Sequence, residues 1–264
     1  MDFEKIVFIS DQVASIAYGI EIVFPYATHT FCCWHLYVNL AKKDKGQIKY
    51  FKYHYWVLCK AYRKADFIKH FDVFTRYLSD CAAHSKDIGF ERWSRLFSER
   101  SRYSYMTSND AESMNVLTVH ARKLPITMLL DYFQVYVQQW YFNNHNIAAA
   151  LTTPVTPHAD VKSKKMMEKS HGWIVRPSTN HLIEVIDGRY NGNVNLDDKT
   201  CSCGQWQKSG ISCGHVLAMT RHFNQTDVNN YVESYFSTEW YRLSYAEHIK
   251  PLPSPAEWID PGNL

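Results

Sequence analysis

The sequence predicts an α+β protein in two parts: an α/β layer that carries a helical insertion, and a small metal-stabilised β/α domain near the C-terminal end. Three observations lead to this prediction. Short β-branched runs alternate with helical periodicity near the N-terminus, and a long aromatic-rich stretch with helical spacing follows. Beyond residue 158, short strand patterns lead into a tight cluster of cysteines.

The first elements alternate between strand and helix. The apolar run Lys5–Ser10 predicts a buried strand, which ends at Asp11. Apolar spacing predicts a helix over 12–23, an extended segment over 28–32 and a second helix from about 34 to 43. This order indicates an α/β layer with Asp11 at the carboxyl end of a strand.

A helical insert follows at about 46–105. Within it, aromatic and apolar residues recur at steps of three and four along one face, which we expect to be core rather than a base-stacking platform: Phe67, Phe71, Phe74 and Leu78. Further helices are predicted to open at Asn109 and to run from about 126 to 144.

Turn and linker composition over 151–158 predicts a boundary between a domain of residues 1–150 and a domain of residues 151–264. The second domain begins with strand patterns at 173–175, 182–186 and 188–195. A helix is predicted over 214–222, and aromatic helical sequence over about 228–248.

Three cysteines and one histidine in this domain have the composition of a closed tetrahedral zinc site: Cys201, Cys203, Cys213 and His215. Side chains two apart in an extended chain point the same way, so Cys201 and Cys203 can face one ion, and Gly204 lets the backbone turn. Cys213 must precede the helix and His215 must lie in its first turn, because side chains two apart within a helix diverge.

The spacing Cys-x-Cys followed by Cys-x-His resembles the SWIM zinc finger, and Ser209-Gly-Ile-Ser-Cys213 matches as well. The resemblance implies a structural Zn²⁺ and a module that contacts DNA or protein, with no catalytic role for the finger.

The N-terminal part resembles the Mutator-like (MULE, MuDR) transposases and their domesticated relatives. The similar segments are Phe8-Ile-Ser-Asp11, Val23-Phe-Pro25, Cys32-Cys-Trp-His-Leu36, Ser108-Asn-Asp-Ala-Glu112 and Arg122 to Leu129. The resemblance implies a ribonuclease-H-like core in which Asp11 and Glu112 are the second and third catalytic carboxylates. In such enzymes two aspartates and a glutamate hold two Mg²⁺ ions for strand cleavage and transfer.

Both carboxylates also have structural interpretations. Asp11 is equally suited to cap the helix over 12–23, and Glu112 to form a capping box with Asn109. The first family aspartate would lie upstream of Asp11, and Asp2 is too far along the same extended element to share a metal. We therefore expect an N-terminally truncated core that lacks catalytic competence as this chain, with Mg²⁺ relevant only to a complete core.

Composition excludes some classes of protein. No apolar run suits a membrane span or a signal peptide, and seven cysteines split into two groups fit reduced thiols inside the cell. The net charge of +3 permits contact with nucleic acid but is weak evidence for it. No feature indicates a small-molecule substrate.

The leading hypothesis is a transposase-derived zinc-binding protein that contacts DNA in the nucleus, the location that the resemblance implies. One alternative is an incomplete sequence of an active DNA transposase. Another is that the finger mainly recognises protein partners.

Overall fold

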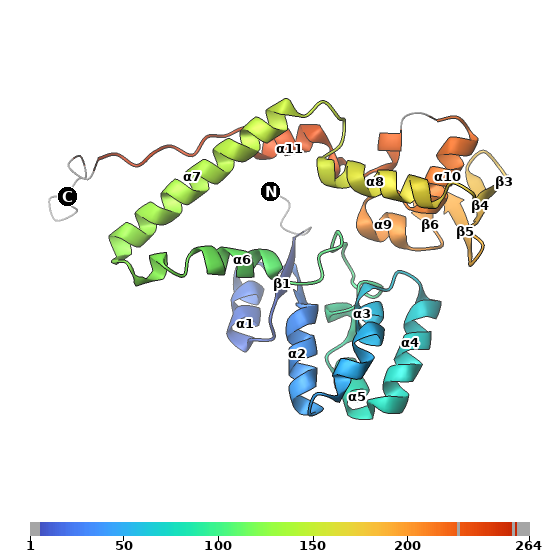
Figure 1. The fold of residues 1–264 in the computed structure, drawn as a ribbon, viewed down its shortest axis with the longest axis horizontal. Helices are drawn as coiled ribbons and strands as arrows, with labels where there is room; N and C mark the ends of the chain where they lie inside the picture. The colour runs from blue at the N-terminus through green and yellow to red at the C-terminus, as the bar shows by residue number, and fades with distance from the viewer. Residues whose placement is uncertain (1–5, 226–227, 255–256, 258–264) are drawn as a thin grey trace. The chain divides into compact units, whose positions relative to one another are not determined.

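The computed structural model describes residues 6–225, 228–254 and 257, which form a mixture of helices and small sheets (Figure 1). The predicted α+β class is therefore confirmed, while a ribonuclease-H-like core stays a prediction. The chain forms two compact units, each built from two stretches: residues 1–109 with 161–232, and residues 110–160 with 233–264. The predicted domains 1–150 and 151–264 also stay a prediction.

The first unit opens with the expected alternation of strand and helix. Strand β1 (Val7–Ser10) pairs in parallel with β2 (Thr28–Phe31), and helix α1 (Ala14–Val23) connects them. The helix begins two residues later than predicted, because Val13 before it is still extended. Within the described residues these two strands form a sheet of their own.

The predicted insert is helical and has its own core. Helix α2 (Cys33–Lys43), predicted from about 34 to 43, precedes it, and the elements of the insert are η2 (Gln47–Phe51), α3 (Lys52–Lys60), α4 (Lys64–Tyr77), α5 (Ser79–Asp87) and η3 (Phe90–Arg92). Phe67, Phe74 and Leu78 are buried and Phe71 packs against them, so the predicted core face is confirmed. Trp93 and Tyr55 stack in the same core, with ring centroids 6.3 Å apart.

The C-terminal stretch of the first unit contains most of helix α8 (Pro157–Lys169), an antiparallel sheet and two further α-helices. Helix α8, which the sequence analysis did not predict, leads into β3 (Ile174–Pro177), β4 (Leu182–Ile186), β5 (Asn191–Asn195) and β6 (Thr200–Cys201), paired in that order. Helices α9 (Gln205–Ser209) and α10 (Gly214–His222) follow, then η5 (Val228–Tyr231). The bounds of β4 and α10 are as predicted. Alternate residues Ile183 and Val185 of β4 are buried against α10.

Hydrogen bonds tie this C-terminal stretch to residues near the end of the insert, after η3. The Lys208 ammonium group donates to the backbone carbonyl of Ser98 at 2.6 Å, and the Ser101 hydroxyl donates to the carbonyl of Lys208 at 2.7 Å.

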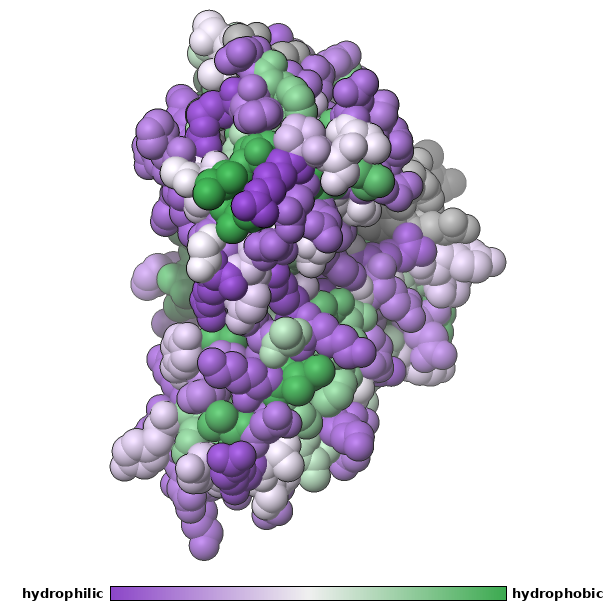
Figure 2. Space-filling model, turned by 90° about the vertical axis from the view of Figure 1, so that its right-hand side faces the viewer, coloured by the Kyte–Doolittle hydropathy of each residue, from purple (hydrophilic) through white to green (hydrophobic). Residues whose placement is uncertain are grey.

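Figure 2 shows that one face of the molecule is largely hydrophilic, with hydrophobic residues in small groups.

The second unit is helical. It contains α6 (Asn109–Leu117), which starts at the division between the units, then η4 (Ala121–Lys123), α7 (Ile126–Ala150), η6 (Ser234–Phe236) and α11 (Thr238–Ser244). Helix α11 lies along α7, where Tyr241 donates to the Asn144 side chain at 2.7 Å (Figure 1). The helical sequence over 228–248 is thus not one helix, since Ser237 caps a new one by accepting from the Trp240 backbone N–H. No helix of the described residues has the length and apolar character that crossing a membrane requires.

Candidate metal centre

The first two cysteines of the cluster lie in a tight turn. Strand β6 ends at Cys201, and the Gly204 N–H donates to the Cys201 carbonyl at 2.8 Å. Cys201 thus ends the strand and Cys203 lies in the turn that follows, so, contrary to the prediction, the two cysteines do not share one extended segment. Gly204 has φ +74°, and a Cβ there would lie 2.6 Å from the Tyr62 carbonyl oxygen, so both conformation and space favour glycine.

The Gln207 side chain holds this turn in place. Its amide oxygen accepts from the Cys201 N–H at 3.3 Å, and its amide nitrogen donates to the Cys201 carbonyl at 3.0 Å. Both backbone groups of Cys201 are thereby satisfied away from the thiol. The side chain of Cys201 is left to face inward, a role for Gln207 that the sequence pattern did not indicate.

The other two residues lie where α10 begins, as predicted. Cys213 is the N-cap with extended φ −78° and ψ 168°, and His215 is the second residue of the helix. This break between extended and helical backbone lets side chains two apart turn toward one point. The N-terminal end of α10 also places the positive end of its dipole beside the thiols.

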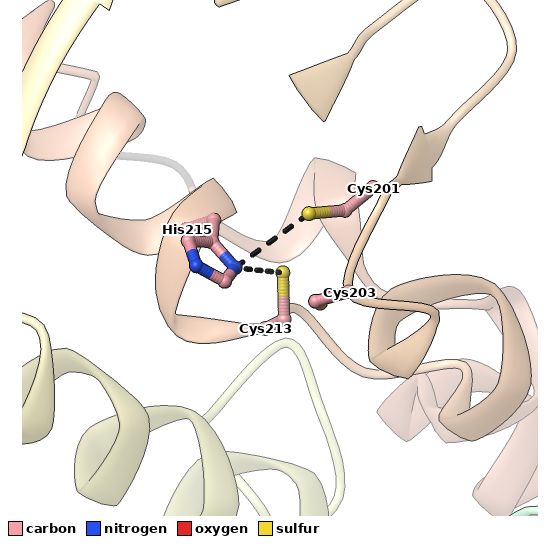
Figure 3. A group of neighbouring side chains, drawn as sticks. All are labelled: Cys201, Cys203, Cys213 and His215. Carbon is pink, nitrogen blue, oxygen red and sulfur yellow. Dashed lines mark hydrogen bonds between the residues drawn. The ribbon is translucent and has the colours of Figure 1, made fainter. Parts of the chain in front are cut away.

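The four side chains converge on one point, and all are buried, with at most 6% of each exposed. One candidate ligand atom from each lies within 4.8 Å of the other three. His215 Nδ1 is 3.6 Å from Cys201 Sγ and 3.9 Å from Cys213 Sγ (Figure 3). A tetrahedral zinc ion, with bonds of about 2.3 Å to sulfur and about 2.0 Å to nitrogen, separates S and N ligands by roughly 3.5 Å. The cluster therefore fits a structural zinc ion.

The thiols strongly influence one another's ionisation. Hydrogen bonding with the Cys203 thiol raises the pKa of Cys201 to about 12. Burial, followed by the hydrogen bonds of the neighbouring thiols, raises the pKa of Cys213. The thiols of Cys201 and Cys213 in turn lower the pKa of Cys203. One negative charge is thus favoured among three sulfurs, and a divalent cation would stabilise the other two as thiolates.

Asp187 fixes the orientation of the histidine ring. Its Oδ2 lies 3.4 Å from His215 Nε2, while its Oδ1 accepts from the backbone N–H groups of Arg189 and Tyr190. Burial raises the pKa of Asp187, but the two backbone donors, together with the charges of His215 and Arg63, lower it overall. Nε2 is buried and forms no hydrogen bond of standard geometry, and the Asp187 carboxylate is the acidic group within 3.4 Å of it. A proton held on Nε2 leaves the Nδ1 lone pair free to bind a metal.

Two glycines make room for this ring and its cover. A Cβ on Gly192 in β5 would lie 2.3 Å from His215 Cδ2, and a Cβ on Gly214 would lie 2.6 Å from the Trp173 ring. The Trp173 ring packs on the His215 ring with centroids 4.9 Å apart. Trp206 is buried in the same core as the three cysteines. The ligand set is therefore enclosed by aromatic rings and closely approaching backbone.

The remaining predicted site residues lie elsewhere. Asp11 follows β1 and accepts from the Val13 N–H at 3.3 Å, in a turn before α1 rather than as the helix N-cap. Glu112 lies in the first turn of α6, which begins at Asn109. Asp11 and Glu112 belong to different compact units, so their joint binding of Mg²⁺ stays a prediction.

Several residues of this centre were not among the predicted site residues: Trp173, Asp187, Gly192 and Gln207. A signal for one of them is present, because Asp187-Gly188 is a typical turn dipeptide just after a strand pattern. The other three act through contacts that depend on pairing of the strands and on side-chain packing.

Comparison with known proteins agrees with the position of the centre. No curated protein and no solved structure matches the chain significantly. One family model does match, and its residues, 191–224, include β5, the four convergent side chains and α10. This stretch of the chain is thus a SWIM zinc finger, as its Cys-x-Cys and Cys-x-His spacing predicted.

Proposed function

We propose that this protein binds one structural Zn²⁺ through its SWIM finger and contacts DNA in the nucleus, as a transposase-derived protein without strand-cleaving activity of its own. One observation supports the zinc assignment above all others. Four buried donor atoms, three sulfurs and His215 Nδ1, lie within 4.8 Å of one another inside the segment that matches the finger. Thiolates and imidazole in this ratio suit zinc better than a hard cation such as Mg²⁺.

The ion would act on structure rather than on a substrate. Four protein ligands fill a tetrahedral shell, so no position stays open for water, and the site is buried beneath Trp173 and Trp206. Zinc would link the turn at Cys201 to the start of α10. Without the ion, these two segments are held together only by packing. The finger is then a rigid support for surface residues around it.

Metal analysis tests the zinc assignment. Purified protein should contain one zinc ion per chain, Cys213→Ser should lose it, and Cys81→Ser should keep it. Cys81 is the matched control because it is also a buried cysteine, but it lies in the core of the helical insert. Wild-type protein that is folded and free of zinc after growth with added zinc would refute the assignment.

The resemblance to Mutator-like transposases and the positive net charge support the proposed contact with DNA. Its competitor is a finger that binds protein partners. DNA binding through phosphates should weaken steeply with rising salt, whereas a largely apolar protein interface should not. Incubation with Mg²⁺ and donor-end DNA should give no cleavage, and cleavage that Asp11→Ala abolishes would overturn the non-catalytic assignment.

A further inference from the structure

A cavity of about 450 Å³ lies beside the metal centre, within the first compact unit. One wall comes from α3 and the start of α4. The other comes from α8, the turn before β5 and the finger, where Cys203 and His215 also line the cavity. A second cavity of about 450 Å³ adjoins it and shares Tyr62, Arg63 and Tyr190. The two together form a cleft between the helical insert and the finger. Their volume is in the range of sites that take small ligands or parts of larger ones.

Positive charge gathers in this cleft. Lys60, Arg63, Lys169 and Arg189 line the larger cavity, against two carboxylates, Asp66 and Asp187. The Asp187 carboxylate is engaged with His215 and with two backbone N–H groups. Among the residues that the structure describes, none of the four cations forms an ion pair. Although Arg63 also attracts the Asp187 carboxylate, the cleft has four cations against two carboxylates and so favours an anionic ligand.

The cations are interleaved with aromatic rings. The Arg63 and Arg189 guanidinium groups lie 4.7 Å and 5.2 Å from the centroid of the same Tyr190 ring. The Lys60 ammonium lies 5.0 Å from the Trp56 ring. Two guanidinium groups at one ring concentrate positive charge there, which attracts an anion. Rings flanked by cations are the usual combination for stacking a base while binding its phosphate.

We propose that this cleft binds a segment of single-stranded nucleic acid, with a base against Tyr190 or Trp56 and phosphates at the surrounding cations. The inference deepens the proposed contact with DNA and rests on it. A duplex keeps its bases stacked inside and presents phosphates and base edges, so the faces of its bases are not available to Tyr190 or Trp56. Single strands expose the faces of their bases, and stacking on a ring is tolerant of sequence.

The metal centre supports this cleft directly. The turn 187–190 holds His215 through Asp187, and the same turn carries Arg189 and Tyr190 into the cleft. On the other side, the Gly204 turn lies against the Tyr62 carbonyl. Loss of zinc would therefore loosen the wall that carries Tyr190 and weaken binding. This effect would be indirect, because none of the four cleft cations is a ligand of the metal.

Fluorescence anisotropy with labelled thymidine and uridine homopolymers of about 12 nucleotides, a length within the usual site sizes, tests the proposal and separates DNA from RNA. Tyr190→Ala should weaken binding roughly 5- to 150-fold, the loss that follows removal of one stacking ring. The matched control is Tyr50→Ala, which removes a ring that is 87% exposed and lies outside the cleft. Tyr190→Leu keeps apolar bulk and should still lose binding, which guards against unfolding as the cause.

Charge is tested in the same assay. Lys60→Gln with Lys169→Gln should reduce the slope of log affinity against log salt by about 0.7 for each lysine. Lys42→Gln with Lys49→Gln, two exposed lysines outside the cleft, should leave the slope unchanged. Zinc content and melting temperature of each variant show that the fold is intact.

The outcomes separate this inference from the proposed function. Single-strand binding that the cleft variants leave unchanged would overturn the cleft and keep DNA binding. Binding to duplex alone would also overturn the cleft and keep DNA binding. No binding to either form would overturn both, while the zinc assignment would stand on metal content. Equal affinity for free thymidine monophosphate and for the homopolymer would replace the nucleic acid with a mononucleotide ligand.

Discussion

Gly192→Ala is the sharpest test of how β5 positions the metal ligand. A Cβ at this residue would lie 2.3 Å from His215 Cδ2, 2.4 Å from Cγ and 2.6 Å from Nε2. Carbon atoms in contact prefer separations of about 3.5–4.0 Å, so the ring or the strand must move by roughly 1.2 Å or more. Zinc–ligand distances tolerate about 0.2 Å, so a ring displaced this far leaves the bonding position.

The expected result has two parts. Overpacking of this kind costs roughly 1–3 kcal/mol of folding free energy. Displacing the ligand should also weaken zinc binding by at least the roughly 10- to 100-fold that follows loss of an outer-shell partner. Competition with a chromophoric zinc chelator measures the affinity, and thermal melting of the zinc-loaded protein measures the stability.

Gly172→Ala is the matched control, since a Cβ there meets nothing within 4 Å. It should leave zinc affinity as in the wild type. If Gly192→Ala bound zinc as tightly and melted at the same temperature as Gly172→Ala, the contact between β5 and His215 would not constrain the centre.

Three further predictions concern the same centre. Asp187→Ala should weaken zinc binding roughly 10- to 100-fold, because His215 loses the acceptor that orients it; an affinity equal to that of Asp198→Ala, an exposed carboxylate nearby, would contradict this role. Chelation, or Cys213→Ser, should lower the melting temperature of the compact unit that contains the finger, since a metal bound only by the folded form stabilises it. An unchanged melting profile after verified zinc removal would be the contrary result. Zinc affinity should fall as pH falls from about 8 to about 6, because Cys201, whose pKa is raised to about 12, and Cys213 must lose protons to bind. Release of about two protons changes the affinity by up to roughly 100-fold per pH unit. A pH-independent affinity would show that the thiols do not bind the ion.

Local patterns predicted most of the secondary structure well. The bounds of β4 and α10 match the structure, because each has strong periodicity and clear end signals. Helix α8 was missed, since the proline and threonine residues before it favoured a linker and its own residues are mostly polar. Residues 228–248 were expected to be helical throughout, but Ser237 starts a separate helix whose position depends on packing against α7.

The sequence by itself determined the chemistry of the finger. Three sulfurs and one imidazole, a glycine suited to a left-handed turn, and a helix that begins between Cys213 and His215 are all properties of a short stretch of chain. Local backbone preferences act over a few residues, so a single stretch is enough to specify them.

Only the tertiary structure decided which atoms face the ion and what surrounds them. The choice of Nδ1 follows from Asp187, the space for the ring follows from Gly192, and the cover follows from Trp173. The cleft likewise joins Arg63 of the insert to Tyr190, just before the finger. These pairs are far apart in the chain, and their contacts arise from strand pairing and close packing, which no local pattern of residues specifies.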